Sequence, residues 1–131
     1  MIYLDTSVAL AHLLAEDRRP PPGLWRGELV SSRLLEYELW TRIHAMDLTR
    51  SHGDAARMLL ARLAWLELHP RVLERALLPF PVPVRTLDAI HLASAGFLLE
   101  QGKGLTLATP DGRLAEAAVA MGIPLWEGWT E

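Results

Sequence analysis

The sequence contains no cysteine among its 131 residues. A chain without thiols forms no disulfide, has no thiolate nucleophile and offers no sulfur ligand to zinc. Disulfide-stabilised folds, thiolate catalysis and cysteine-ligated zinc sites are therefore excluded.

Long apolar runs and a signal peptide are also missing. Hydrophobic residues make up 50% of the chain, yet no run approaches the roughly 18 consecutive apolar residues that a membrane-spanning helix needs. Met1 is followed directly by a strand-like stretch, without the basic segment and apolar core of a signal peptide. We expect a soluble, cytoplasmic protein that does not associate with membranes. Its length is typical of a single domain, spanning residues 1–131.

Positive charge is scarce for a protein that binds nucleic acid. The formal net charge is −3, whereas nucleic-acid-binding domains normally carry a basic excess. The basic residues are almost all arginine, with Lys103 as the single lysine, and arginine makes bidentate contacts with phosphate. A GC-rich coding sequence or thermal adaptation would produce the same preference for arginine over lysine. The composition therefore permits an RNA ligand without favouring one.

Short apolar runs alternate with stretches of helical periodicity. Such runs are typical of strands buried on both faces, as in a parallel sheet covered by helices. The expected strands lie at residues 2–4, 29–31, 82–84 and 105–108, with a weaker one at 123–126. Three expected helices lie at 7–16, 87–101 and 111–121, and Thr86 and Thr109 are the expected N-caps of the last two. Two further helices are indicated by apolar stripes. One stripe runs through Leu35, Leu39, Ile43 and Met46, and the other runs through Ala55, Met58, Leu59, Leu63 and Leu66. The alternation predicts a three-layer α/β/α domain around a central parallel sheet of four to five strands.

Three aspartates fall just beyond expected strands. Asp5 ends the first run, Asp88 follows the run at 82–84, and Asp111 follows the run at 105–108. An acid in the first turn of a helix is favoured by the helix dipole alone, so each position taken singly has a structural explanation. The recurrence at three strand ends favours a shared role, because the carboxyl ends of parallel strands meet at one edge of a sheet.

A fourth acid, Glu38, lies on the apolar face of its expected helix. An ionised carboxylate on a buried face is costly unless a cation or hydrogen-bond donors satisfy it. One explanation is an ion pair with Arg42, one turn further along the same face. The alternative, which we favour, is that Glu38 points into a polar cleft with the aspartates.

Clustered carboxylates repel one another, and a divalent cation removes that repulsion. Hard oxygen ligands suit Mg²⁺ or Mn²⁺ better than zinc. A carboxylate-bound Mg²⁺ ion orients a phosphodiester, lowers the pKa of bound water and stabilises the leaving oxygen. The pattern predicts metal-assisted phosphodiester hydrolysis.

Four segments resemble the motifs of PIN-domain ribonucleases. They are YLDTS at 3–7, SRLLEYE at 32–38, RTLDAIHLASA at 85–95 and TPDGRLAEAA at 109–118. Their order and context are most similar to the VapC-type toxins of toxin–antitoxin pairs, and the resemblance covers nearly the whole chain. Two departures stand out: Ser7 replaces a frequent Asn, and Pro110 and Gly112 flank Asp111 in a way that puts its role in question.

The resemblance implies a PIN fold, a metal-dependent endoribonuclease activity with Mg²⁺ or Mn²⁺, and RNA as substrate. It implies catalytic and metal-binding roles for Asp5, Glu38, Asp88 and Asp111, with the hydroxyls of Thr6, Ser7 and Thr109 holding carboxylates or water. It also implies a homodimer and a small DNA-binding antitoxin as partner. Arg42, Arg85 and Arg113 flank the expected cleft and are candidates for phosphate contacts, or are simply ion-pair partners.

Other interpretations stay open at this point. A degenerate PIN domain would bind RNA or a partner without cleaving, and a housekeeping nuclease would use the same acids in RNA processing. A phosphatase of the haloacid dehalogenase type needs a D-x-D motif, but Ser7 stands at the second position. His91 lies one turn from Asp88, and we interpret it as a structural histidine rather than an acid–base catalyst.

Overall fold

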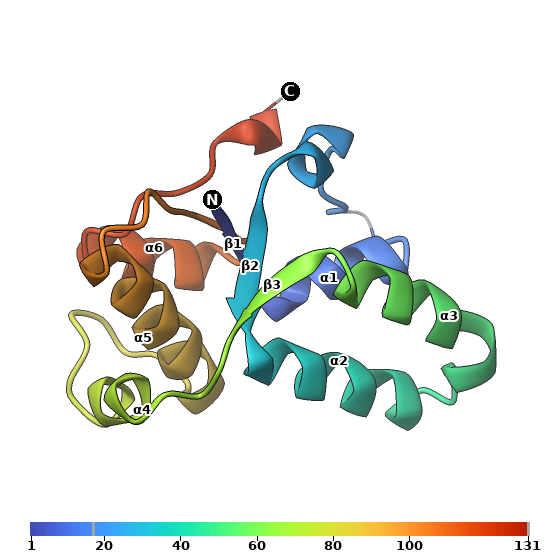
Figure 1. Cartoon of the computed structure of the whole chain (residues 1–131), viewed down its shortest axis with the longest axis horizontal. Helices are drawn as coiled ribbons and strands as arrows, with labels where there is room; N and C mark the ends of the chain where they lie inside the picture. The colour runs from blue at the N-terminus through green and yellow to red at the C-terminus, as the bar shows by residue number, and fades with distance from the viewer. Residues whose placement is uncertain (17, 131) are drawn as a thin grey trace.

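A computed structural model describes residues 1–16 and 18–130 of the chain, and it contains a parallel sheet covered by helices (Figure 1). The strands are β1 (Ile2–Leu4), β2 (Leu29–Ser32), β3 (Leu63–Leu66) and β4 (Thr106–Ala108). The α-helices are α1 (Thr6–Leu13), α2 (Arg33–Ala45), α3 (Thr49–Leu60), α4 (Pro70–Ala76), α5 (Thr86–Glu100) and α6 (Gly112–Ala120). Two 3₁₀ helices, η1 (Pro22–Arg26) and η2 (Gly128–Thr130), complete the described elements. The predicted three-layer α/β/α fold is confirmed.

The strand order places the start and the end of the chain side by side. The order is β3-β2-β1-β4, and all three pairings are parallel. The chain therefore moves outward from β1 through β2 to β3 and then returns to the other side of β1. In parallel α/β sheets such a reversal leaves a crevice at the carboxyl ends of the two strands between which it occurs. Here those strands are β1 and β4.

Helices cover both faces of the sheet, and the strand residues alternate between two apolar cores. In Figure 1, α1, α2 and α3 lie on one side of the strands, and α4, α5 and α6 lie on the other. Leu4 of β1 and Leu29 of β2 belong to the core beneath the first group. Their neighbours Tyr3 and Val30 belong to the core beneath the second group. Burial on both faces explains why these strands read as continuous apolar runs.

The sequence-based assignment of one strand was wrong. Residues 82–84 form no strand and lie in a loop between α4 and α5. Pro81 and Pro83 have no N–H to donate to a ladder, so this segment is a poor partner for a sheet. The fourth strand is instead β3, which pairs with β2. Leu63 and Leu66 of β3 fall on the apolar stripe that we predicted for a helix, because short apolar runs fit both periods.

Several helix boundaries also differ from the prediction. The first helix begins at Thr6 and ends at Leu13, because Asp5 caps it. Thr86 is the first residue of α5 rather than its cap, and the cap of α6 is Asp111, not Thr109. Residues 123–126 contribute only an isolated bridge, between Leu125 and Leu107.

The buried faces of α2 and α3 were predicted with unequal success. Leu35, Leu39 and Ile43 are buried as expected, whereas Met46 is 47% exposed beyond the end of α2. On α3 the buried residues are Gly53, Ala56, Leu59 and Leu60, so the expected stripe through Ala55 and Met58 was displaced.

None of the described helices combines the length and apolar character needed to cross a membrane.

The buried stripe of α2 yields a stability prediction. Leu35 is fully buried on α2, so Leu35→Ala removes core contacts and leaves a cavity. We expect a loss of about 2–5 kcal/mol in the free energy of unfolding, measured by denaturant titration. Met58→Ala on the exposed face of α3 serves as the control, with a change within about 0.5 kcal/mol. Equal losses for the two variants would contradict the assigned faces.

Candidate active site

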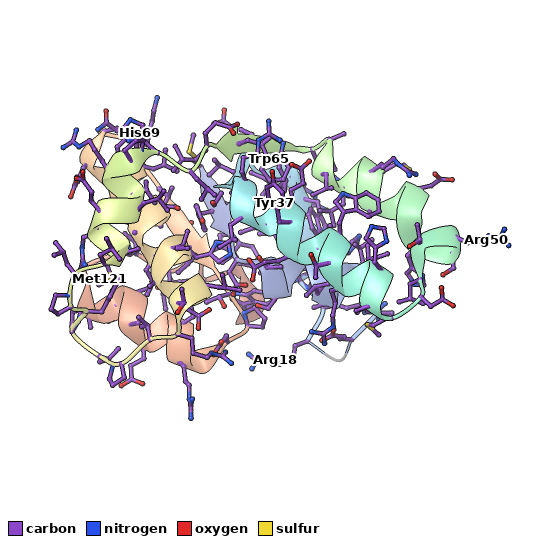
Figure 2. The ribbon with its side chains drawn as sticks, turned by 90° about the horizontal axis from the view of Figure 1, so that it is seen from below. Arg18, Tyr37, Arg50, Trp65, His69 and Met121 are labelled. Atoms are coloured by element: carbon purple, nitrogen blue, oxygen red, sulfur yellow. The ribbon has the colours of Figure 1, made fainter. Side chains whose placement is uncertain are left out.

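Polar side chains gather where the central strands end. The arrow of β2 points downward in Figure 1, so Figure 2, seen from below, looks onto the edge where the strands end. Asp5 directly follows β1 and Thr109 directly follows β4. The Thr109 hydroxyl donates a hydrogen bond to Oδ2 of Asp5, which ties the two strand ends together at the reversal in strand order.

Asp5 is a buried carboxylate with several donors. It is 6% exposed, and it caps α1 by accepting from the backbone N–H of Ser7 at 2.5 Å. The Ser7 hydroxyl lies 2.8 Å from Oδ1 and 2.7 Å from Oδ2. Burial raises the pKa of Asp5 above its ordinary value, against the hydrogen bonds from Thr109 and Ser7, which lower it. The protein therefore holds a carboxylate where its charge is costly.

Glu38 reaches the same edge from α2. Its Oε1 accepts from the Thr6 hydroxyl at 2.6 Å and lies 2.8 Å from Nε2 of His91. Burial raises the pKa of Glu38, but the hydrogen bonds from His91 and Thr6 outweigh it and hold the pKa below its ordinary value. Within the described chain Glu38 makes no ion pair with Arg42. Glu38 lines the same pocket as the three aspartates.

Asp88 and Asp111 lie at the starts of α5 and α6 and share one cationic neighbour. Arg85 Nε lies 3.4 Å from Oδ2 of Asp88, and its Nη2 lies 3.9 Å from Oδ2 of Asp111. Asp111 also accepts from the backbone N–H of Arg113 at 2.9 Å. Asp88 follows a loop rather than a strand, so its position at this edge comes from the placement of α5.

All four acids line one pocket. Its volume is about 720 Å³, and Asp5, Glu38, Asp88 and Asp111 all contribute to its wall. A second pocket of about 680 Å³ lies between α4, α5 and the turn after α6, but Glu74 and Glu100 are its only acids among the described residues. The pockets are similar in size, so the density of carboxylates distinguishes the first. We call it the acidic pocket.

The three candidate arginines differ in position. Arg42 and Arg85 line the acidic pocket, whereas Arg113 lines a smaller adjoining pocket of about 180 Å³ together with Arg85 and Asp88. Arg85 is 78% exposed at its side chain even though it pairs with Asp88. Of the three, Arg85 is thus an ion-pair partner here, and Arg42 and Arg113 have no carboxylate partner in the described chain.

Sequence reasoning gave no site role to Tyr37 or His91, although both line the acidic pocket. Tyr37 lines it and is 66% exposed, and Figure 2 labels it on α2. His91, which we interpreted as a structural histidine, also lines it, and its Nε2 contacts Glu38. The position of Tyr37 beside Glu38 in the sequence was the only available signal. The His91–Glu38 contact spans 53 residues, so no local pattern indicates it.

The carboxylates do not form a closed metal site. Among residues 1–16 and 18–130, no three histidine or acidic side chains are grouped tightly enough to hold an ion. The contacts supply a physical reason: Arg85 lies between Asp88 and Asp111, and hydroxyls donate to both oxygens of Asp5. Carboxylates also repel one another unless a divalent cation bridges them. The donor set nevertheless fits a hard divalent cation, which prefers carboxylate oxygens.

The fold and the acidic pocket define a parallel α/β/α domain of the PIN class. A family model described as PIN domain matches residues 2–120. Because the match covers most of the sequence, the chain belongs to the PIN domain family, as the sequence motifs implied.

Named relatives make the assignment more specific. Ribonuclease VapC46 of Mycobacterium tuberculosis (strain ATCC 25618 / H37Rv) is 39% identical over 131 residues, covering 93% of each chain. Ribonuclease VapC35 of Mycobacterium tuberculosis (strain CDC 1551 / Oshkosh) is 35% identical over 129 residues, covering 94% of this chain and 93% of the relative. Both carry the VapC name, which confirms the resemblance to VapC-type proteins drawn from the motifs.

A solved structure shares the fold. The crystal structure of VapBC2 from Rickettsia felis bound to a DNA fragment from their promoter contains a chain that matches with a TM-score of 0.68. The match covers 96% of this chain and 98% of that chain at 15% sequence identity. At this identity the likeness supports the fold alone.

The burial of Asp5 yields a prediction about stability and pH. Its pKa is higher in the folded than in the unfolded chain, so the stability that it contributes is present at low pH and is lost as the pH rises through the folded-state pKa. Asp5→Asn removes the charge and keeps the shape. In EDTA at pH 7 we expect its melting temperature to exceed that of the wild type by a few degrees, on the order of 1 kcal/mol per unit of pKa shift.

The difference should shrink as the pH falls, because the wild-type Asp5 then becomes protonated. Asp54→Asn on α3 is the control, since the Asp54 side chain is fully exposed and should leave the melting temperature nearly unchanged. A lower melting temperature for Asp5→Asn at pH 7 would show that the hydrogen bonds of the carboxylate outweigh its burial.

Proposed function

We propose that this protein is a metal-dependent endoribonuclease and the toxin of a toxin–antitoxin pair. The observation that carries the proposal is the convergence of Asp5, Glu38, Asp88 and Asp111 on one pocket at the carboxyl edge of the sheet. They come from four separate segments, so ordinary helix capping does not account for their meeting. The names of the VapC relatives support RNA as the substrate.

The donor set suits Mg²⁺ or Mn²⁺. Asp5 and Asp88 are the surest ligands, with Glu38 and Asp111 completing the site or activating water. An ion bound there would orient a phosphodiester, make water a better nucleophile and stabilise charge on the leaving oxygen.

The protein's own contacts prepare two of these carboxylates in different ways. Thr6 and His91 keep Glu38 ionised, which suits a group that binds a cation. Burial raises the pKa of Asp5 because its charge is poorly solvated, and a bound cation would offset that cost. Ser7 and Thr109 hold Asp5 in a fixed orientation at the floor of the pocket.

RNA binding would depend on local groups, because the net charge is −3 and gives no general attraction for phosphate. Arg42 lines the acidic pocket and Arg113 lines the adjoining one, so both can contact phosphates on either side of the cleaved bond. Tyr37 offers an exposed ring on which an unpaired base can stack.

A small DNA-binding antitoxin of the VapB type is the partner that the comparisons support, since the structural neighbour is a VapBC pair bound to promoter DNA. A homodimer through the helices around residues 33–66 extends the same proposal. Exposed Met46 and Met58 on this part of the chain supply apolar surface for it.

Two other functions use the same fold. A housekeeping RNA-processing nuclease would need the same acids, and a genomic neighbour encoding a short antitoxin would separate it from a toxin. A degenerate binding module would need none of them. The presence of all four acids in one pocket argues against the binding module.

The central prediction concerns metal-dependent cleavage. Purified protein should cleave a labelled mixed RNA pool with Mn²⁺ or Mg²⁺ but not with EDTA. Asp5→Asn should lower the rate by roughly two orders of magnitude or more, because it weakens the site that stabilises charge in the transition state. Asp54→Asn, which changes an exposed acid far from the pocket, should cleave like the wild type.

Different failures have different meanings. Cleavage that survives EDTA or Asp5→Asn would overturn the proposed activity. Mn²⁺ should also raise the melting temperature of the wild type, because an ion that binds the folded state stabilises it. The absence of both cleavage and this shift would favour the binding module.

Replacing Arg85 should have opposite effects on Mn²⁺ binding and on RNA binding. Its guanidinium lies within 4 Å of both Asp88 and Asp111, so it competes with a cation for the same carboxylates. Arg85→Ala should tighten Mn²⁺ binding by about fivefold, as judged by calorimetry. The same variant should weaken RNA binding in a salt-dependent way, because one phosphate contact is lost.

Arg57→Ala is the matched control, since Arg57 is also exposed and paired with an aspartate, but on α3. It should change neither quantity. Weaker Mn²⁺ binding by Arg85→Ala would contradict the idea that the guanidinium and the cation compete.

A further inference from the structure

His91 is a buried histidine in the wall of the acidic pocket. It is 2% exposed, and both ring nitrogens have partners. Nδ1 lies 2.8 Å from the hydroxyl of Tyr3, and Nε2 lies 2.8 Å from Oε1 of Glu38 and 3.0 Å from the Thr6 hydroxyl. So far His91 has entered the proposed chemistry only as a group that lowers the pKa of Glu38.

The partners determine the direction of these hydrogen bonds. A carboxylate oxygen of Glu38 only accepts hydrogen bonds, and the Thr6 hydroxyl already donates to it. Nε2 must therefore carry a hydrogen and donate to Oε1. Burial raises the pKa of Tyr3, so its hydroxyl keeps its proton and can donate to Nδ1 of His91.

The contact also joins the two helical layers. Glu38 belongs to α2 on one side of the sheet, and His91 belongs to α5 on the other (Figure 1). Asp88 lies one turn before His91 on the same helix. A bond from His91 to Glu38 therefore sets how far Glu38 stands from Asp88 across the pocket.

Tyr3 anchors this arrangement in the core. It is fully buried in β1, two residues before Asp5. Its ring packs edge-on against the imidazole, with the ring centroids 5.8 Å apart. Tyr3 therefore holds His91 from β1, the strand that ends directly before Asp5, which is the most buried of the four acids.

We propose that His91 is a positioning residue that holds Oε1 of Glu38 so that Oε2 faces the acidic pocket as a cation ligand. The inference rests on the proposed metal-dependent function and adds a residue to it. His91 touches neither ion nor substrate. It acts through Glu38, and the Tyr3 hydroxyl holds the imidazole in the orientation that this requires.

The test is a calorimetric titration with Mn²⁺ alone, on the folded protein at a temperature well below its melting point. His91→Leu should bind Mn²⁺ about tenfold more weakly than the wild type, the usual effect of removing a group that orients a ligand. His91→Gln retains an N–H donor and should recover part of the loss. The Leu92→Val control, buried on the same helix, should lose stability without a change in Mn²⁺ affinity.

A double-mutant cycle separates positioning from a general structural role. In a Glu38→Gln background, His91→Leu should cause no further weakening, because the residue through which His91 acts is already changed. An equal loss in both backgrounds would overturn the proposal. So would wild-type affinity in folded His91→Leu.

If His91→Leu does not fold, Tyr3→Phe is the test variant. It keeps the aromatic ring of residue 3 and removes only the hydroxyl that contacts Nδ1 of His91. It should weaken Mn²⁺ binding by about threefold, and unchanged affinity would overturn the proposal. A wild-type protein that binds no Mn²⁺ would overturn the metal-dependent function together with this inference. Wild-type binding that is insensitive to His91 would overturn the inference alone.

Discussion

A buried carboxylate at the reversal in strand order is the constraint on which the site depends. Asp5 leaves β1 beside the end of β4, so its side chain enters the interior of the domain, where its charge is poorly solvated. The neighbouring structure is arranged to tolerate that charge. Ser7 and Thr109 donate to it, and the N-terminus of α1 begins directly after it.

The acidic pocket lies between helices that pack on opposite faces of the sheet. Glu38 comes from α2, and Asp88 and His91 come from α5. Helices on opposite faces are separated by the sheet over most of their length, so their side chains meet only beyond its edge. The His91–Glu38 hydrogen bond lies at this meeting point, where a small shift of either helix would change the spacing of the acids.

Different neighbouring groups act on the charges of the four acids in the pocket. Donors lower the pKa of Glu38, burial raises the pKa of Asp5, and Arg85 neutralises part of the charge on Asp88 and Asp111. Asp5 and Glu38 thus have their own hydrogen-bond donors, and Asp88 and Asp111 share Arg85, which lessens the repulsion among the four acids. An incoming cation would take over part of what Arg85 supplies, and the arginine would then be free to contact phosphate.

The sequence by itself determined the features that depend on local pattern. The alternation of apolar runs and helical stripes predicted the parallel α/β/α architecture, and the motifs around Asp5, Glu38, Asp88 and Asp111 identified the family and the pocket. Local reasoning failed at β3, because the spacing of Leu63 and Leu66 suits a helix as well as a strand. It also failed at residues 82–84, where the prolines exclude an otherwise plausible strand.

Only the tertiary structure decided which groups meet across long separations. Thr109 and Asp5 are 104 residues apart, and Tyr3 and His91 are 88 apart. Their contacts follow from the pairing of β1 with β4 and the packing of α5 against the sheet, which no short window of sequence contains. A helical pattern shows which face of α2 is buried, but the partner of a buried polar group depends on the element that packs against it, and for Glu38 that element is α5.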